Sequence, residues 1–123
     1  MTRQEAQAFT EQWASDWNKL AVERVLADFD DRVAFTSPTA AAFVGAPTVS
    51  GKEALRDYWN KAVARVGSLR FIVDRVLWDE ASGELAIIYI ADIGGRRRRV
   101  SENLTFSADG RVVSAEVFHG VDA

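Results

Sequence analysis

Two stretches near the end of the chain decide its fold: Val100-Ser-Glu-Asn-Leu-Thr-Phe106 and Val112-Val-Ser-Ala-Glu-Val-Phe-His119. Successive side chains of a β-strand point to opposite faces, so every second residue shares a face. The residues that share an apolar face are Val100, Glu102, Leu104 and Phe106 in the first strand, and Val113, Ala115, Val117 and His119 in the second. Each apolar face thus carries one titratable group. Glu102 and His119 either face a common reaction chamber or are two polar side chains within a core.

Two further strands precede this pair, and the four are expected at about 69–78, 84–93, 96–107 and 111–119. The connections between them carry turn residues, among them Gly94-Gly95 and Asp109-Gly110. Short connections between consecutive strands indicate an antiparallel meander.

Helices are expected in the first half of the chain. Thr2 and Glu5 form a capping-box pattern, and Phe9, Trp13 and Trp17 then recur at every fourth position. A second, short helix buries Val22, Val25, Leu26 and Phe29, and Asp30-Asp31 end it. A second capping box, from Ser50 to Glu53, opens a helix whose apolar side is Leu55, Trp59, Ala62, Val63 and Val66.

The segment between these helices is expected to hold a strand from Arg32 to Ser37, which Pro38 ends. Residues 39–50 are expected to form a loop with at most a short edge strand around Phe43-Val44. The whole pattern predicts one α+β domain over residues 1–123, with helices packed on one face of a curved antiparallel sheet.

Composition narrows the class of protein. The chain has 123 residues, of which 48% are hydrophobic and 27% charged, as in globular proteins. The net charge of −3 disfavours nucleic acid and anionic membranes as partners, and the run Arg96–Arg99 is expected to be solvated at a hairpin tip. Cysteine is absent and one histidine with scattered carboxylates lacks ligand spacing, so no metal site and no cofactor are expected. Without an apolar signal core at the N-terminus or a membrane-spanning stretch, we expect a cytoplasmic protein.

The strand from Leu85 to Ile93 is apolar on both faces. An antiparallel sheet with a solvated outer face would be polar there. A second copy of the chain is the simplest cover, so the sequence predicts a homodimer through the outer face of the sheet.

The order of elements and several signatures resemble the nuclear transport factor 2-like superfamily, in its SnoaL-like and ketosteroid isomerase-like branch. The residues that carry the resemblance are Trp13, Trp17-Asn18, Phe35-Thr-Ser-Pro38, Gly51-Lys-Glu-Ala-Leu-Arg-Asp-Tyr-Trp59, Glu102-Asn-Leu-Thr-Phe106 and Asp109-Gly-Arg-Val112. The resemblance implies a cone-shaped, cystatin-like fold, in which a curved antiparallel or mixed sheet wraps around helices in the order α-α-β-(β)-α-β-β-β-β. This scaffold hosts isomerases, cyclases, hydrolases and non-catalytic binding proteins, so it implies a pocket rather than one activity.

The isomerase residues are only partly present at the matching positions. Where those enzymes have a tyrosine on the first helix, this chain has Trp13, whose indole can donate a hydrogen bond but cannot act as a proton-transferring acid. Where they have a catalytic aspartate base before a proline, this chain has Ser37. Their protonated aspartic acid corresponds to Glu102. Steroid double-bond isomerisation by the familiar mechanism is therefore not expected.

Two other branches remain open. The likeness to polyketide cyclases implies an acidic residue with nearby histidine, which Glu102 and His119 could supply. The likeness to limonene-epoxide hydrolases implies an acid–arginine–acid arrangement, for which Glu102, Arg98 and, if it faces inward, Asp92 are the candidates.

We therefore expect a pocket for a hydrophobic small molecule, with Glu102 and His119 as candidate catalytic residues. The expected lining residues are Trp13, Phe35, Ser37, Tyr58, Trp59, Arg98 and Val117. The favoured function is a cofactor-independent isomerase, cyclase or lyase that uses general acid/base chemistry on an apolar, carbonyl-bearing metabolite. The alternatives are a non-catalytic dimeric binding protein and an epoxide-hydrolase-like enzyme.

Overall fold

The structure, a computed structural model, describes residues 1–123 and contains four helices and six strands. Their order along the chain is α1 (Arg3–Asn18), α2 (Val22–Leu26), β1 (Phe29–Thr36), α3 (Pro38–Val44), β2 (Thr48–Ser50), α4 (Lys52–Arg65), β3 (Leu69–Asp79), β4 (Glu84–Ile93), β5 (Arg96–Phe106) and β6 (Val112–Asp122). None of the helices combines the length and the apolar character needed to cross a membrane.

All six strands belong to one curved sheet, in the order β2-β1-β6-β5-β4-β3. Neighbouring strands are antiparallel except β1 and β6, which are parallel, so the sheet is mixed. The strands of the meander begin and end within a few residues of the expected positions. The predicted α+β class with a curved sheet wrapped around helices is confirmed.

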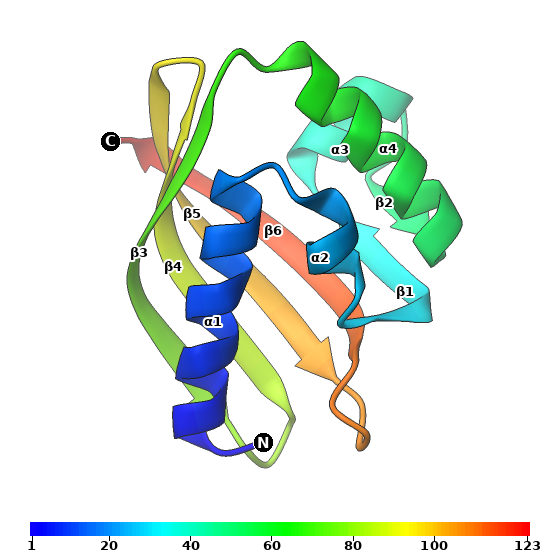
Figure 1. Ribbon diagram of the computed structural model, residues 1–123, viewed down its shortest axis with the longest axis vertical. Coiled ribbons are helices and arrows are strands. Elements are labelled where there is room, and N and C mark those ends of the chain that lie inside the picture. Colours follow the sequence, from blue (N-terminus) through cyan, green and yellow to red (C-terminus); the bar gives the residue numbers. More distant parts are fainter.

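The helices pack on the concave side of the sheet (Figure 1). Helix α1 packs against β3, whereas α4 packs against β1 and α2. The side chain of Asn18, at the end of α1, accepts a hydrogen bond from the Phe71 backbone N–H at 2.7 Å and donates one to the Phe71 carbonyl at 3.2 Å. These two hydrogen bonds to the β3 backbone fix the end of α1 against the sheet. The capping box of Thr2 and Glu5 is present at the other end of the helix.

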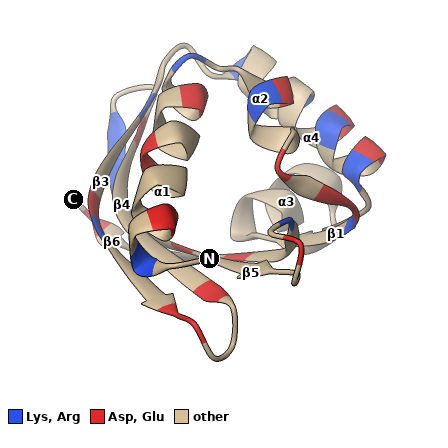
Figure 2. Ribbon diagram, turned by 60° about the horizontal axis from the view of Figure 1, so that its bottom comes forward, with Lys and Arg blue, Asp and Glu red and all other residues tan.

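Apart from Arg65 at its end, the charged residues of α4 lie on the side of the helix that is turned away from the sheet, where Figure 2 shows blue and red segments alternating. Three ion pairs, of Arg56 with Glu23 and Glu53 and of Lys61 with Asp57, hold this surface. The opposite side of α4 contributes Leu55, Tyr58 and Trp59 to the core. This amphipathic division turns the aromatic side of α4 toward the interior.

Strand alternation in β5 follows the prediction, because Val100, Glu102, Leu104 and Phe106 are all buried. In the register with β6, Glu102 lies opposite Val117, and Val100 lies opposite His119. Alternation fails at the start of β6, where an irregularity in the β5–β6 register makes Val112 the buried residue and leaves Val113 half-buried. Strand β6 also continues to Asp122, so His119 lies inside the strand and not at a frayed end.

The segment after β1 differs from the expectation. Residues 38–44 form helix α3 and not a loop with an edge strand around Phe43-Val44; the short edge strand is β2. Ser37 caps the helix by accepting a hydrogen bond from the Thr39 backbone N–H, and Pro38 occupies the first turn. Pro38 therefore begins a helix at the point where the strand ends, which is a common use of proline.

Two other boundaries were wrong. Helix α2 ends at Leu26, and Phe29 is the first residue of β1, so its buried ring belongs to the sheet. The cap of α4 is Gly51, with φ of 91° and no side-chain hydrogen bond, and not Ser50, which lies in β2. A positive φ favours glycine at this position because it has no Cβ.

Candidate functional site

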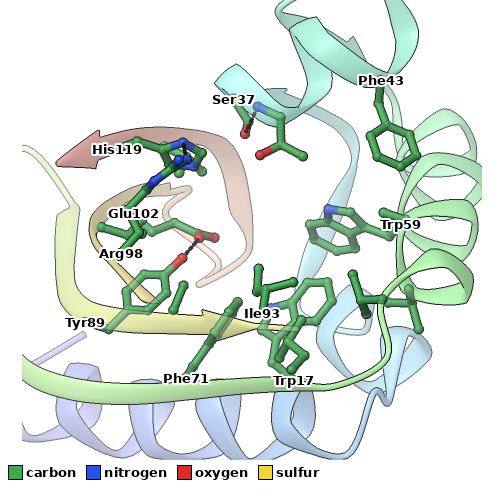
Figure 3. Close-up of a pocket in the computed structure, with 18 of the residues that line it drawn as sticks. Trp17, Ser37, Phe43, Trp59, Phe71, Tyr89, Ile93, Arg98, Glu102 and His119 are labelled. Carbon is green, nitrogen blue, oxygen red and sulfur yellow. Dashed lines mark hydrogen bonds between the residues drawn. The ribbon is translucent and has the colours of Figure 1, made fainter. Parts of the chain in front are cut away.

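A cavity of about 500 Å³ lies between the sheet and helices α3 and α4. Its volume is typical of a small-molecule site. Aromatic and aliphatic side chains make up most of the wall, while Glu102, His119, Arg98 and Tyr89 form a polar group on the sheet side (Figure 3). Phe43 and Trp59 lie across the cavity from them. The cavity therefore has one strongly polar wall, which faces a wall that is mostly apolar.

Glu102 is the only carboxylate that lines the cavity, and its side chain is buried with 5% of the residue exposed. Burial raises its pKa from 4.5 to about 7, because the charged form loses hydration, and a hydrogen bond from Tyr89 offsets part of this rise. One oxygen, Oε1, accepts the bond from the Tyr89 hydroxyl at 3.0 Å. The other oxygen has no protein partner and is free to meet a ligand.

Tyr89 connects β4 to Glu102 on β5. It lies opposite Val100 in the register, so Glu102 is its diagonal neighbour, at a separation that long side chains span. Burial and the adjacent Glu102 raise the pKa of Tyr89 well above its ordinary value of 10. Its phenol therefore remains a hydrogen-bond donor to the carboxylate and holds that group in one orientation.

His119 has Arg98 as its partner and not Glu102. The Nη1 of Arg98 lies 2.8 Å from Nδ1 of His119. A guanidinium can only donate, so Nδ1 accepts and the ring proton is on Nε2. Burial and the charge of Arg98 lower the pKa of His119 below 6.5, which keeps the ring neutral at neutral pH. His119 is therefore a neutral N–H donor, held in one tautomer by Arg98.

The far wall supplies two hydroxyl groups. Ser37 lines the cavity and uses its oxygen as an acceptor in the α3 cap, so its hydroxyl proton is available to a ligand. Burial and the charge of Glu102 raise the pKa of Tyr58 to about 12, so its phenol also stays protonated. The aromatic rings of Phe35 and Trp59, whose centroids are 5.4 Å apart, pack edge to face and form an apolar part of the cavity wall.

All the residues predicted to line a pocket do line this cavity, with one exception. Trp13 is buried behind the wall, where its ring packs against Phe71 at 5.3 Å and Tyr89 at 5.2 Å between centroids. Phe71 and Tyr89 line the cavity in its place, and Trp17, one turn further along α1, also reaches it. The indole N–H of Trp13 is buried without a hydrogen-bond partner, so it offers nothing to a ligand.

Sequence reasoning did not identify several lining residues. The sequence does not orient Tyr89, because its strand is apolar on both faces and alternation then gives no contrast between them. Arg96 is expected from the sequence to be solvated at a hairpin tip, yet it lines the cavity, and so does Arg65, which the sequence does not single out. For Arg96 the signal was available, because it shares strand parity with Arg98 and Glu102.

The structure also decides the orientation of Asp92. It lies opposite Arg97 in the β4–β5 register, on the face away from the cavity, and it is not a lining residue. The second acid of an epoxide-hydrolase arrangement is therefore missing from this cavity. No group of three His, Asp or Glu side chains is placed to hold a metal ion.

A family model described as the SnoaL-like domain matches residues 10–121. No curated protein matches the chain in sequence. Among solved structures, a SnoaL-like protein of unknown function from Burkholderia thailandensis superposes with a TM-score of 0.88 at 26% identity, covering 98% of both chains. The epoxide hydrolase/cyclase-like enzyme SalBIII, with a role in pyran ring formation in salinomycin, gives a TM-score of 0.76 at 17% identity over 96% of this chain and 92% of its own. A computationally designed 17-OHP binder gives a TM-score of 0.74 at 17% identity, over 94% of this chain and 91% of its own. The fold is thus that of the nuclear transport factor 2-like (NTF2-like) proteins, and the chain belongs to the SnoaL-like domain family.

Proposed function

We propose that the chain is a cofactor-independent enzyme that moves a proton on an apolar, carbonyl-bearing metabolite, in the manner of an isomerase, cyclase or lyase. One observation carries this proposal: a single carboxyl group, that of Glu102, is buried in an aromatic cavity with a pKa of about 7. A carboxyl group with an ordinary pKa would be a weak base, whereas one near 7 can take up and return a proton at neutral pH.

The chemistry follows from the positions of the donors. Ionised Glu102 takes a proton from the carbon next to a carbonyl group, and the electron pair moves onto the carbonyl oxygen. The Nε2–H of His119 and the hydroxyl of Ser37 are neutral donors on the cavity wall that can stabilise the oxygen as it gains charge. Glu102 then returns the proton to a second carbon, which completes an isomerisation. Tyr89 is a positioning residue here, since it acts through the carboxylate.

Hydrogen–deuterium exchange tests the proposal without knowledge of the natural substrate. Apolar ketones such as 2-tetralone and β-ionone are incubated with the protein in D₂O, and loss of the α-proton signal is followed by NMR. The wild type should accelerate exchange over buffer, and Glu102→Gln should lower that rate by roughly 100-fold or more while ligand-induced rises in melting temperature persist. The matched control is Glu116→Gln, because Glu116 is exposed on the neighbouring strand β6.

A second candidate is a non-catalytic binding protein for a hydrophobic small molecule. It is supported by Ser37, which stands where ketosteroid isomerases have their catalytic base, and by the likeness of the fold to the designed 17-OHP binder. The same experiment separates the two functions. Ketones that raise the melting temperature of the wild type without any exchange above buffer would favour the binding protein.

A further inference from the structure

The charge of the cavity is opposite to that of the chain. The protein has a net charge of −3, yet three arginines line the cavity against the single carboxyl of Glu102. None of these three, Arg65, Arg96 and Arg98, forms an ion pair with an Asp or Glu side chain. Arg99, their neighbour on the outer face of β5, is paired with Asp74 at 3.0 Å. The three arginines that face the cavity therefore have no carboxylate partner in the protein.

Arg98 is the innermost of the three, and it is half-buried. Its one hydrogen bond within the protein is to Nδ1 of His119. A guanidinium has five N–H donors in a planar fork, so most of them are left without a protein partner. A neutral imidazole cannot balance the charge, and a half-buried cation next to apolar walls gains from an anion that binds there.

Arg65 and Arg96 extend this positive charge to the rim. Arg96 precedes Arg98 by two residues and shares its face of β5, at the end of the Gly94-Gly95 hairpin. Arg65 lies at the end of α4, with its guanidinium 4.6 Å from the centre of the Phe43 ring. The hydrogen bond of Gly94 N–H to the Ser68 carbonyl, at 3.0 Å, joins the α4–β3 connection to this hairpin. Both exposed arginines thus belong to the same end of the cavity.

We propose that the cavity binds an amphipathic carboxylate, an extension of the function proposed above: the carboxylate pairs with Arg98, and the apolar body lies against Trp59 and Phe35. The planar fork of arginine matches the two oxygens of a carboxylate. Arg98 and Glu102 are four residues apart on one strand, or roughly 13 Å between their Cα atoms. An oxo acid that reaches both groups has its carboxylate and its carbonyl at opposite ends of the molecule, separated by several bonds.

Isothermal titration calorimetry with 2-naphthylacetate and its methyl ester tests this assignment, since the two probes differ in charge and share an apolar body. The wild type should bind the acid about ten-fold more tightly than the ester, as expected for a charge-assisted hydrogen bond. Arg98→Gln should abolish that preference by lowering the affinity for the acid while the affinity for the ester stays unchanged. Arg96→Gln should lower the affinity for the acid by a smaller factor than Arg98→Gln does, because Arg96 is exposed. Arg97→Gln, on the opposite face of the same strand, is the matched control and should change neither affinity.

Equal affinities for acid and ester in the wild type, or no binding of either, would overturn the assignment. The assignment would also be overturned if Arg98→Gln lowered the affinity for the ester as much as the affinity for the acid. The outcome is independent of catalysis, because both probes are scored by binding and not by turnover. A preference for the acid without exchange of any ketone would leave the anion site standing and reject the enzyme. Exchange of ketones without a preference for the acid would support the enzyme and reject the anion site.

Discussion

Glu102→Gln should make the stability of the protein less dependent on pH, because it removes the one buried carboxyl of the cavity. The folded protein holds the pKa of Glu102 at about 7 against an ordinary value of 4.5. As the pH rises from 4.5, the unfolded chain loses this proton first, while the folded chain keeps it until about pH 7. The stability contributed by the protonated group is therefore complete below pH 4.5 and is lost as the pH rises through 7.

The size of the loss follows from the shift. The difference between about 7 and 4.5 is about 2.5 units, and one unit corresponds to about 1.4 kcal/mol, so complete ionisation of Glu102 costs the folded state about 3 to 4 kcal/mol. Glutamine cannot ionise, and its carbonyl can still accept the hydrogen bond from Tyr89 at Oε1. The free energy of unfolding of the variant minus that of the wild type should thus grow by about 3 kcal/mol between pH 4 and pH 8.

Urea unfolding followed by the fluorescence of the four tryptophans measures this difference at each pH. Any constant cost of burying the glutamine amide cancels, because only the change with pH is compared. Glu116→Gln is the control, and its difference from the wild type should stay flat because Glu116 is exposed. If the curves for Glu102→Gln and the wild type are parallel, then Glu102 does not lie in the dry environment that the proposed chemistry needs.

Three further outcomes are expected. Tyr89→Phe removes the hydrogen bond that lowers the pKa of Glu102, so the midpoint of the pH–rate profile of ketone exchange should move above 7; an unchanged midpoint would show that the bond does not act on the base. Ser37→Ala removes the cap of α3 and should lower the free energy of unfolding by about 1 kcal/mol in urea, whereas no loss would mean that the cap is not formed. We also expect a second copy of the chain to cover the outer face of the sheet, where Phe118 and Leu77 are 53% and 56% exposed; light scattering should show a dimer that Phe118→Glu converts to a monomer, and a monomeric wild type would reject this expectation.

The strands and their faces could be predicted from the sequence because alternation is a local property. One buried and one half-buried residue repeat along β5, so the inward direction of Glu102 followed from its neighbours alone. The same rule failed at Val113, where an irregularity in the β5–β6 register shifts the pattern by one residue. It could not orient Tyr89, since both faces of β4 are apolar. Helix α3 was missed because Ser37-Pro38 is compatible both with the end of a strand and with the start of a helix.

The sequence by itself determined the family, the curved sheet on helices and the presence of two titratable groups on one concave face. The tertiary structure decided which groups they meet. Tyr89 pairs with Glu102, and Arg98 pairs with His119, so the two titratable groups belong to two separate hydrogen-bonded pairs. Phe71 and Tyr89 displace Trp13 from the cavity wall. The physical reason is that such contacts depend on strand register and sheet curvature, which join residues far apart in the chain and leave no periodic trace along it.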